Sequence, residues 1–130
     1  MVLQRIHAAA AIVLVAVIVV QVFLAGAAIA DLGGNGNFDG HVEFGYSWVG
    51  LAALAVLLSG LAARPGRGHL LWVVAVFVDY IVQTLLPSLK SITPALGALH
   101  PVNALVLFGL SVLVARRAIS LGATRTGADN

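Results

Sequence analysis

Four long runs of apolar residues, separated by short polar stretches, account for nearly all of the 130-residue chain. A helix needs about 20 mainly apolar residues to cross the roughly 30 Å hydrocarbon core of a membrane. The runs predict membrane-spanning helices over residues 6–30, 41–63, 69–87 and 96–118. Because the loops between them are short, consecutive spans should be antiparallel neighbours. The pattern therefore predicts an all-α, four-helix, up-and-down transmembrane bundle forming one domain over residues 1–130.

The composition places the chain in the same class. Hydrophobic residues make up 61% of the chain and charged residues 9%, whereas soluble domains have about 45–50% apolar and about 25% charged residues. The lack of cysteine excludes disulfides, thiolate-bound metals and iron–sulfur clusters. Since the four spans use almost every residue, any chemistry must lie between the helices or at their ends.

The basic residues predict the orientation of the bundle. Short cytoplasmic loops are enriched in Lys and Arg. The arginines flank the N-terminus, the loop between the second and third spans, and the C-terminal tail: Arg5, Arg64, Arg67, Arg116, Arg117 and Arg125. We therefore expect both termini in the cytoplasm and the loops at residues 31–40 and 88–95 outside. The net charge of +2 does not indicate a nucleic-acid partner, because no aromatic residues interleave with the arginines.

The segment AGAAIAD at residues 25–31 is similar to a signal-peptide cleavage site. The apolar stretch before it exceeds the roughly 7–15 residues of a signal core. We therefore expect the first span to be retained as a membrane helix.

Polar positions inside the apolar runs repeat between the two halves of the chain. Histidine precedes glutamine by 14 positions in both odd spans and precedes glycine by nine positions in both even spans. The residues are His7, Gln21, His69 and Gln83 in the odd spans, and His41, Gly50, His100 and Gly109 in the even spans. The repeat indicates a tandem duplication of a helix pair.

The histidines form two pairs at matching depths, His7 with His69 at the cytoplasmic end and His41 with His100 at the outer end. In an up-and-down bundle the spans of each pair face each other diagonally, about 12–14 Å apart if neighbouring axes are about 8–10 Å apart. That separation suits a flat porphyrin between two imidazoles. The sequence therefore predicts one or two haem b groups, with iron bound by two histidines at each site.

Uncharged polar residues share helix faces with these histidines. At about 100° per residue, 14 positions are close to four turns, so the glutamines point inward near the outer end. The serines of the even spans point inward near the cytoplasmic end by the same phase. We expect these side chains, together with an asparagine one turn after the last histidine, to orient the imidazoles or the haem edge. They are Gln21, Gln83, Ser59, Ser111 and Asn103.

Small residues next to the histidines could leave room for a porphyrin, although small residues also line ordinary helix interfaces in membranes. They are Ala10, Ala11, Gly45, Gly97 and Ala104. Pro101 fits the first turn of a helix. Alternatively, the fourth span begins at Pro94 and bends at Pro101.

Asp79 is the only ionisable carboxyl deep in a span, where a charge costs at least about 2.5–3.5 kcal/mol. That makes it a candidate functional residue. A structural role is the alternative, with the carboxyl either protonated or paired with Tyr46 or Tyr80.

Two resemblances add to this picture. The segments ALGALHPVNALVLFGLSVLVARRA at 95–118, FLAG at 23–26 and FDGHVEFGY at 38–46, with Gln83, resemble a family of small four-helix bacterial membrane proteins of unknown function. This resemblance implies the fold and a place in the bacterial inner membrane. The histidine layout is similar to that of four-helix haem b proteins such as haem A synthase and the ascorbate-reducible two-haem cytochromes, which is an analogy between sites. The substrate-handling residues of the synthase have no counterparts here.

Three functions are compatible with these features. Iron with both axial positions filled favours electron transfer over oxygen chemistry, with a quinol or a redox protein as partner. A cofactor-free accessory or small-ligand-binding bundle is the alternative, and haem sensing or transport is a third. The sequence predicts no catalytic residue and leaves a homo-oligomer open.

Overall fold

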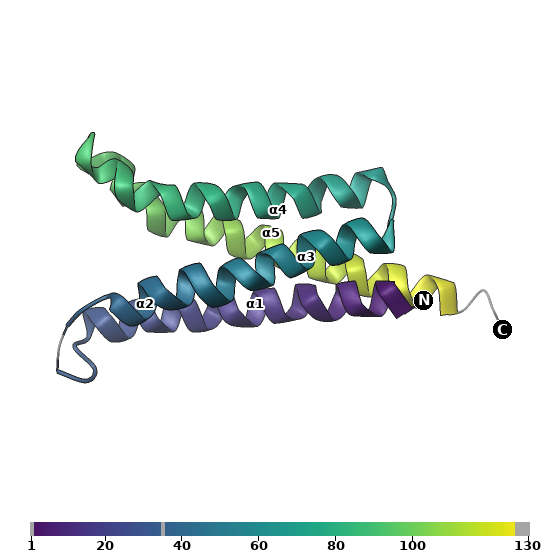
Figure 1. Cartoon of the computed structure of the whole chain (residues 1–130), viewed down its shortest axis with the longest axis horizontal. Helices are drawn as coiled ribbons and strands as arrows, with labels where there is room; N and C mark the ends of the chain where they lie inside the picture. The colour runs from purple at the N-terminus through teal and green to yellow at the C-terminus, as the bar shows by residue number, and fades with distance from the viewer. Residues whose placement is uncertain (1, 35, 127–130) are drawn as a thin grey trace.

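The computed structural model describes residues 2–34 and 36–126, and all regular structure in that part is helical. Residues 127–130 of the expected tail and the side chain of Arg125 lie outside the described part. Four helical segments are long and apolar enough to cross a membrane: Val2–Ile29, Asp39–Ala63, Arg67–Ser91 and Pro94–Leu121. They run up and down, with the start of the first segment and the end of the fourth at the same end of the bundle (Figure 1). The predicted all-α, four-helix transmembrane bundle is confirmed.

The spans differ in how they are built. The first is α1 (Val2–Ile29); the second joins α2 (Asp39–Phe44), the π-helical η1 (Gly45–Val49) and α3 (Gly50–Ala63); the third joins α4 (Arg67–Leu85) and the 3₁₀ helix η2 (Leu86–Ser91); the fourth is α5 (Pro94–Thr126). Pro101 lies inside α5. Of the two expected starts of the fourth span, the structure therefore has the one at Pro94.

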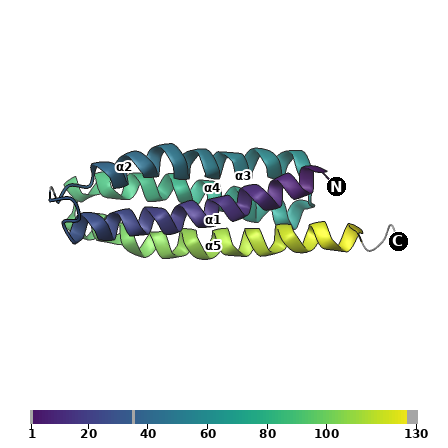
Figure 2. The same ribbon diagram turned by 90° about the horizontal axis from the view of Figure 1, so that it is seen from below.

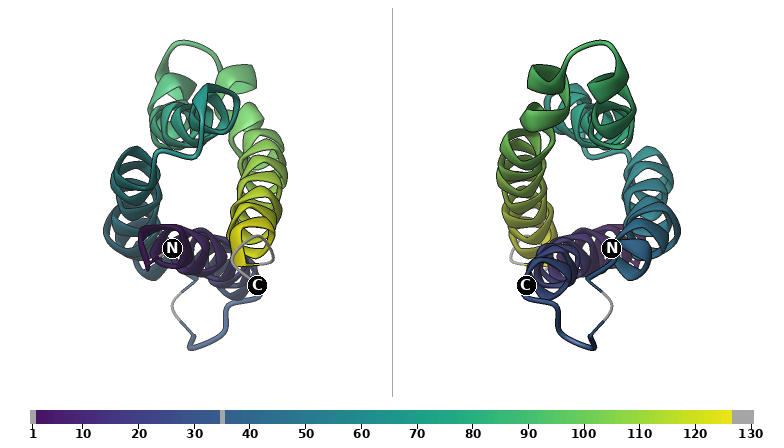
Figure 3. Two further views of the ribbon diagram at one scale, coloured as in Figure 1. Left: turned by 90° about the vertical axis from the view of Figure 1, so that its right-hand side faces the viewer. Right: turned by 90° about the vertical axis from the view of Figure 1, so that its left-hand side faces the viewer.

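The helices form a ring in which α1 packs against α3 and α5, and α4 packs against the same two helices. Figure 2 shows α1 between α3 and α5. Seen end-on, α1 lies opposite α4, and α3 lies opposite α5 (Figure 3). The diagonal partners are therefore the first with the third span and the second with the fourth.

Apolar side chains fill the middle of the ring. Leu14, Val56, Val73, Val76 and Val114 are fully buried there. Large apolar side chains also cover the outside of the bundle, as in Phe23, Leu71 and Leu105. Such a surface is expected of helices that face lipid. The apolar centre separates two polar layers, one near each end.

Glycine and proline set the sharp turn between α3 and α4. Arg64 ends α3 with a left-handed φ of 46°, and Gly66 follows with a φ of 100°. Pro65 has no N–H to continue the helix and also disfavours helical geometry in the residue before it. This three-residue turn makes α3 and α4 antiparallel neighbours.

The π-helical turn η1 lies where Tyr80 of α4 meets the second span. The Tyr80 hydroxyl donates a hydrogen bond to the Gly45 carbonyl oxygen at 3.3 Å. A Cβ on Gly50 would lie 2.5 Å from the same hydroxyl oxygen. The lack of a side chain at Gly50, just after η1, thus lets the tyrosine ring reach the backbone of the second span. No spacing in the sequence predicts this contact.

Candidate functional site

The cytoplasmic histidine pair crosses the bundle diagonal from α1 to α4. The Nε2 atoms of His7 and His69 lie 2.9 Å apart, and the ring centres lie 5.1 Å apart at an interplanar angle of 89°. Their side chains are buried, with His7 2% and His69 6% exposed. Two imidazoles from the first and third spans therefore meet on the bundle axis.

Hydrogen bonds determine which nitrogens of this pair carry protons. Ser59 Oγ lies 3.0 Å from His7 Nδ1 and 3.2 Å from the Val56 carbonyl oxygen. The Ser59 hydroxyl has one proton, which it donates to Val56, so it accepts from His7 Nδ1. His7 Nε2 is then an acceptor, and His69 Nε2 donates to it. His69 Nδ1 remains as a buried acceptor without a hydrogen-bond partner.

The outer pair crosses the other diagonal, from α2 to α5. The rings of His41 and His100 have centres 6.1 Å apart at an interplanar angle of 83°. His41 Nδ1 lies 3.1 Å from the backbone carbonyl oxygen of Gln21, and His100 Nδ1 lies 3.0 Å from the backbone carbonyl oxygen of Gln83. A carbonyl only accepts, so both rings carry their proton on Nδ1 and leave Nε2 unprotonated. A histidine that binds a metal through Nε2 has this tautomer and often this contact.

The glutamine side chains contact the same rings. Gln21 Nε2 donates to the carbonyl oxygen of His41 at 2.9 Å and lies 3.2 Å from His41 Nε2. Gln83 Nε2 lies 3.4 Å from His100 Nε2. In each half of the chain, one glutamine thus contacts the outer histidine twice, through its backbone carbonyl and through its side-chain amide. Both glutamines point inward at the outer end, as their spacing predicts.

The halves differ around these glutamines. Asn103 Nδ2 donates to Gln83 Oε1 at 3.0 Å. Three residues after His41, the position matching Asn103 is Phe44, which has no donor in its side chain. Gln21 Oε1 is accordingly buried without a hydrogen-bond partner. An unsatisfied acceptor of this kind is open to a water or to a donor on a ligand.

Asp79 lies beside the Asn103 side chain, and its Oδ2 is buried without a hydrogen-bond partner. The alternative in which it pairs with a tyrosine is wrong. Tyr80 donates instead to Gly45, and Tyr46 is exposed. The carboxyl is therefore connected, through Asn103 and Gln83, to the outer histidine pair.

Ser59 and Ser111 have different surroundings although both were expected beside the cytoplasmic pair. Ser59 contacts His7. Ser111 points inward and is 1% exposed, but its hydroxyl donates to the Leu107 carbonyl oxygen one turn back, at 2.8 Å. A serine often satisfies its hydroxyl within its own helix in this way. Ser111 therefore makes no hydrogen bond to either histidine.

Other side chains fill part of the space beside the small residues that were expected to make room for a porphyrin. A Cβ on Gly45 would lie 2.7 Å from Gln21 Nε2, and one on Gly97 would lie 2.8 Å from Lys90 Cβ. Ala11 packs in the apolar core. Gly60, which the repeat does not single out, lies against the cytoplasmic pair, because its Cβ would come within 3.2 Å of His7 Cε1. The glycine nearest to an imidazole thus comes from α3.

Two further polar residues lie at the cytoplasmic end. Gln4 is buried one turn before His7, and its Oε1 has no hydrogen-bond partner. The guanidinium carbon of Arg117 lies 5.4 Å from the ring centre of Trp72, in cation–π geometry. The three-residue spacing of Gln4 and His7, which puts them on one helix face, could have identified Gln4 as a polar residue of this end. No sequence signal pairs Arg117 with Trp72.

The spacing of each pair can be compared with that of two imidazoles on one metal. A metal–imidazole bond is about 2 Å long, so opposed nitrogens lie about 4 Å apart and the ring centres about 6 Å apart. The outer pair matches in ring spacing and tautomer. In the cytoplasmic pair the Nε2 atoms are about 1 Å closer than two ligands on one metal, and His69 Nε2 would have to give up its proton to bind a metal. Among the described residues, no group of three or more His, Cys, Asp or Glu side chains could hold a metal ion.

No family model, characterised protein or solved structure matches the chain. The function is therefore inferred from the residues themselves.

Proposed function

We propose that the protein is a membrane b-type cytochrome that transfers electrons. His41 and His100 would hold one haem, and His7 and His69 would hold a second. The 6.1 Å spacing of the His41 and His100 ring centres carries the proposal, because it is close to the spacing of about 6 Å expected for two imidazoles on one iron. The Nδ1 contacts to Gln21 and Gln83 support it, since they leave Nε2 free as a ligand.

Haem iron supplies one-electron chemistry, and with two axial histidines it has no open position for a substrate. The two pairs lie near opposite ends of the bundle, because His7 and Gln21 are 14 residues, about 21 Å, apart on α1. Sites at both ends would connect the two sides of a membrane. A quinol or a redox protein is the proposed partner, and a homo-oligomer is compatible with the same sites.

The chain must rearrange in two places to hold haem. At the outer pair, the Gln21 and Gln83 amides would swing away from the Nε2 atoms; their carbonyl contacts to Nδ1 are on the backbone and can persist. At the cytoplasmic pair, the hydrogen bond between His7 and His69 would open. The outer pair can keep its backbone contacts to Nδ1 when haem binds, so we propose that it binds haem more tightly.

The proposed location is the inner membrane of a bacterium, with both termini in the cytoplasm. The arginines at the terminal end of the bundle support this orientation. The four helical segments of membrane-spanning length support a membrane location.

Absorption spectroscopy of the purified full-length protein, expressed with ample haem, tests the proposal. We expect sharp bands of low-spin b haem on reduction and up to two haems per chain. His41→Ala with His100→Ala should remove one haem and keep the other, and His7→Ala with His69→Ala should do the reverse. Ser111→Ala is the matched control, because the hydroxyl of that serine bonds within its own helix. A colourless protein with intact helical circular dichroism would refute the proposal.

A cofactor-free accessory or small-ligand-binding bundle is the second candidate. The observation in its favour is the 2.9 Å hydrogen bond that His7 and His69 form with each other, since it satisfies both Nε2 atoms without a ligand. Haem sensing or transport would instead give weak, substoichiometric colour that exchanges with added haem. The same spectra therefore separate all three functions.

A further inference from the structure

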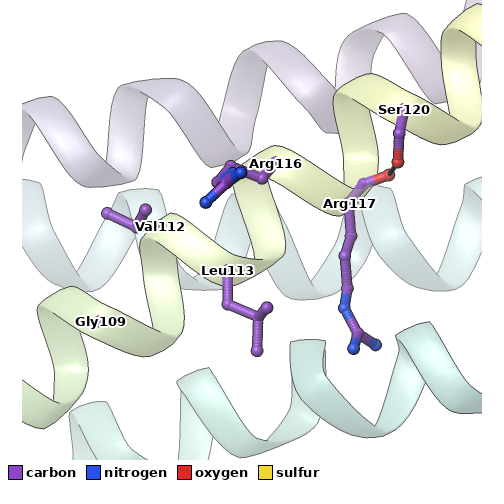
Figure 4. A pocket seen from close by; sticks show the side chains of 6 residues that line it. All are labelled: Gly109, Val112, Leu113, Arg116, Arg117 and Ser120. Carbon is purple, nitrogen blue, oxygen red and sulfur yellow. Dashed lines mark hydrogen bonds between the residues drawn. The ribbon is translucent and has the colours of Figure 1, made fainter.

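A groove of about 450 Å³ lies along one face of α5, toward the cytoplasmic end of the bundle. It is lined by Gly109, Val112, Leu113, Arg116, Arg117 and Ser120. Leu113 and Arg117 extend toward α4 along one side (Figure 4). The groove is apolar over its first turn and carries two guanidinium groups toward its other end.

Gly109 forms the apolar end of the groove. A Cβ added there would meet no atom within 4 Å, so no neighbouring helix packs against this position. From Gly109 to Ser120 the helix rises about 16 Å, which is close to half of the roughly 30 Å hydrocarbon core. The groove thus has the length of one leaflet.

Among the described residues, no acidic side chain lies at the level of the arginines at the other end. Acidic residues of the described part lie in the opposite loop, in α2 or in the outer half of α4: Asp31, Asp39, Glu43 and Asp79. Arg5, Arg64 and Arg67 belong to the same end as the groove and add positive charge. The described residues at this end therefore carry an excess of positive charge, which attracts an anion.

The Arg117 guanidinium is already positioned, because it stacks on Trp72 of α4 at 5.4 Å. A planar guanidinium donates paired hydrogen bonds to a phosphate, and a held guanidinium loses less freedom on binding. Arg116 places a second guanidinium beside the same groove. The geometry suits a phosphate group that carries an apolar chain.

We propose that this groove binds one anionic glycerophospholipid from the leaflet at the terminal end of the bundle. Arg116 and Arg117 hold its phosphate, and an acyl chain lies along Gly109 and Leu113. The charge complementarity and the one-leaflet length identify this occupant. The site does not depend on haem.

Trp72 provides a probe for the test, because Trp48 is the only other tryptophan. The full-length Trp48→Phe protein in detergent is titrated with phosphatidylglycerol while Trp72 emission is recorded. We expect a saturable change at about one lipid per chain, and a much weaker response to phosphatidylcholine with the same acyl chains. Arg116→Gln should weaken binding about five-fold, the effect of one arginine at a lipid surface.

Two variants and one soluble anion separate a lipid site in the groove from general attraction of anions to this end of the bundle. Gly109→Leu fills the groove where its Cβ meets nothing, so it should weaken binding without affecting the fold. Arg64→Gln removes a charge from the same end, outside the groove, and should leave binding unchanged. Equal binding of the two lipids, or equal losses in Arg64→Gln and Arg116→Gln, would overturn the proposal. Inorganic phosphate binding as tightly as the lipid would also overturn it.

Discussion

His41 and His100 come from different halves of the chain, yet their ring centres lie 6.1 Å apart and each ring donates Nδ1–H to the carbonyl of the glutamine in the preceding span. The same contact made twice supports a duplicated helix pair. The halves are not identical, because Asn103 stands where the first half has Phe44. The differences between the halves provide matched controls for several experiments.

The hydrogen bond between Asn103 and Gln83 should stabilise the bundle measurably. A double-mutant cycle of Asn103→Leu and Gln83→Leu is expected to give a coupling energy of about 0.6 kcal/mol and at most about 1.7 kcal/mol, the range for polar pairs between membrane helices. The measurement is reversible unfolding in mixed micelles. A coupling energy of zero would mean that the 3.0 Å contact does not contribute to stability.

Asp79→Val introduces the residue that the first half has ten positions after its histidine, Val17. We expect the free energy of unfolding to rise by about 1 kcal/mol or more, because a carboxyl with a buried, unpartnered Oδ2 is replaced by an apolar group. The same micelle unfolding assay measures it. A decrease would show that the contact between the carboxyl and Asn103 outweighs the cost of burying it.

Gly50 and Gly109 are equivalent in the repeat but should respond oppositely to alanine. At Gly50 the new Cβ would lie 2.5 Å from the Tyr80 hydroxyl, so Gly50→Ala should destabilise the bundle. At Gly109 it meets nothing within 4 Å, so Gly109→Ala should stabilise by up to about 1 kcal/mol through helix propensity. Adding Tyr80→Phe should partly rescue Gly50→Ala. Equal effects at the two glycines would contradict the packing of Tyr80.

Ser59→Ala removes the acceptor of His7 Nδ1–H and should lower the free energy of unfolding by about 1 kcal/mol. Ser111→Ala is the control. It deletes a buried hydroxyl that bonds only within its own helix, and it should change stability by much less. Nitrogen-15 spectra of the histidine rings check this explanation. The population of the Nδ1–H tautomer of His7 should fall in Ser59→Ala and stay unchanged in Ser111→Ala.

The absence of cysteine allows the orientation to be tested without background labelling. Ser88→Cys should react with a membrane-impermeant maleimide in intact cells, whereas Gly68→Cys should react only after permeabilisation. Gly68 is exposed and its Cβ meets no atom within 4 Å, so the substitution should not disturb the fold. The opposite labelling pattern would place the termini outside.

Much of the candidate site could be anticipated from spacing. Helical phase placed Gln21, Gln83 and Ser59 on the inner faces, where the structure has them. It could not show that Ser111 bonds to its own helix, because a serine hydroxyl has a nearby carbonyl in any helix. It also missed the hydrogen bond from Tyr80 to Gly45, because the π-helical turn η1 depends on contacts between spans.

The sequence by itself determined the class of this protein. Four apolar runs of membrane-spanning length and short loops allow little besides an up-and-down bundle, because backbone polar groups in lipid must be satisfied within each helix. Tertiary structure decided the rest: which nitrogens of His7, His41 and His100 carry protons, which buried polar atoms have no hydrogen-bond partner, and that Arg117 stacks on Trp72. Those features depend on ångström-scale contacts between residues far apart in the chain, and a one-dimensional pattern fixes only the helix face that a residue occupies.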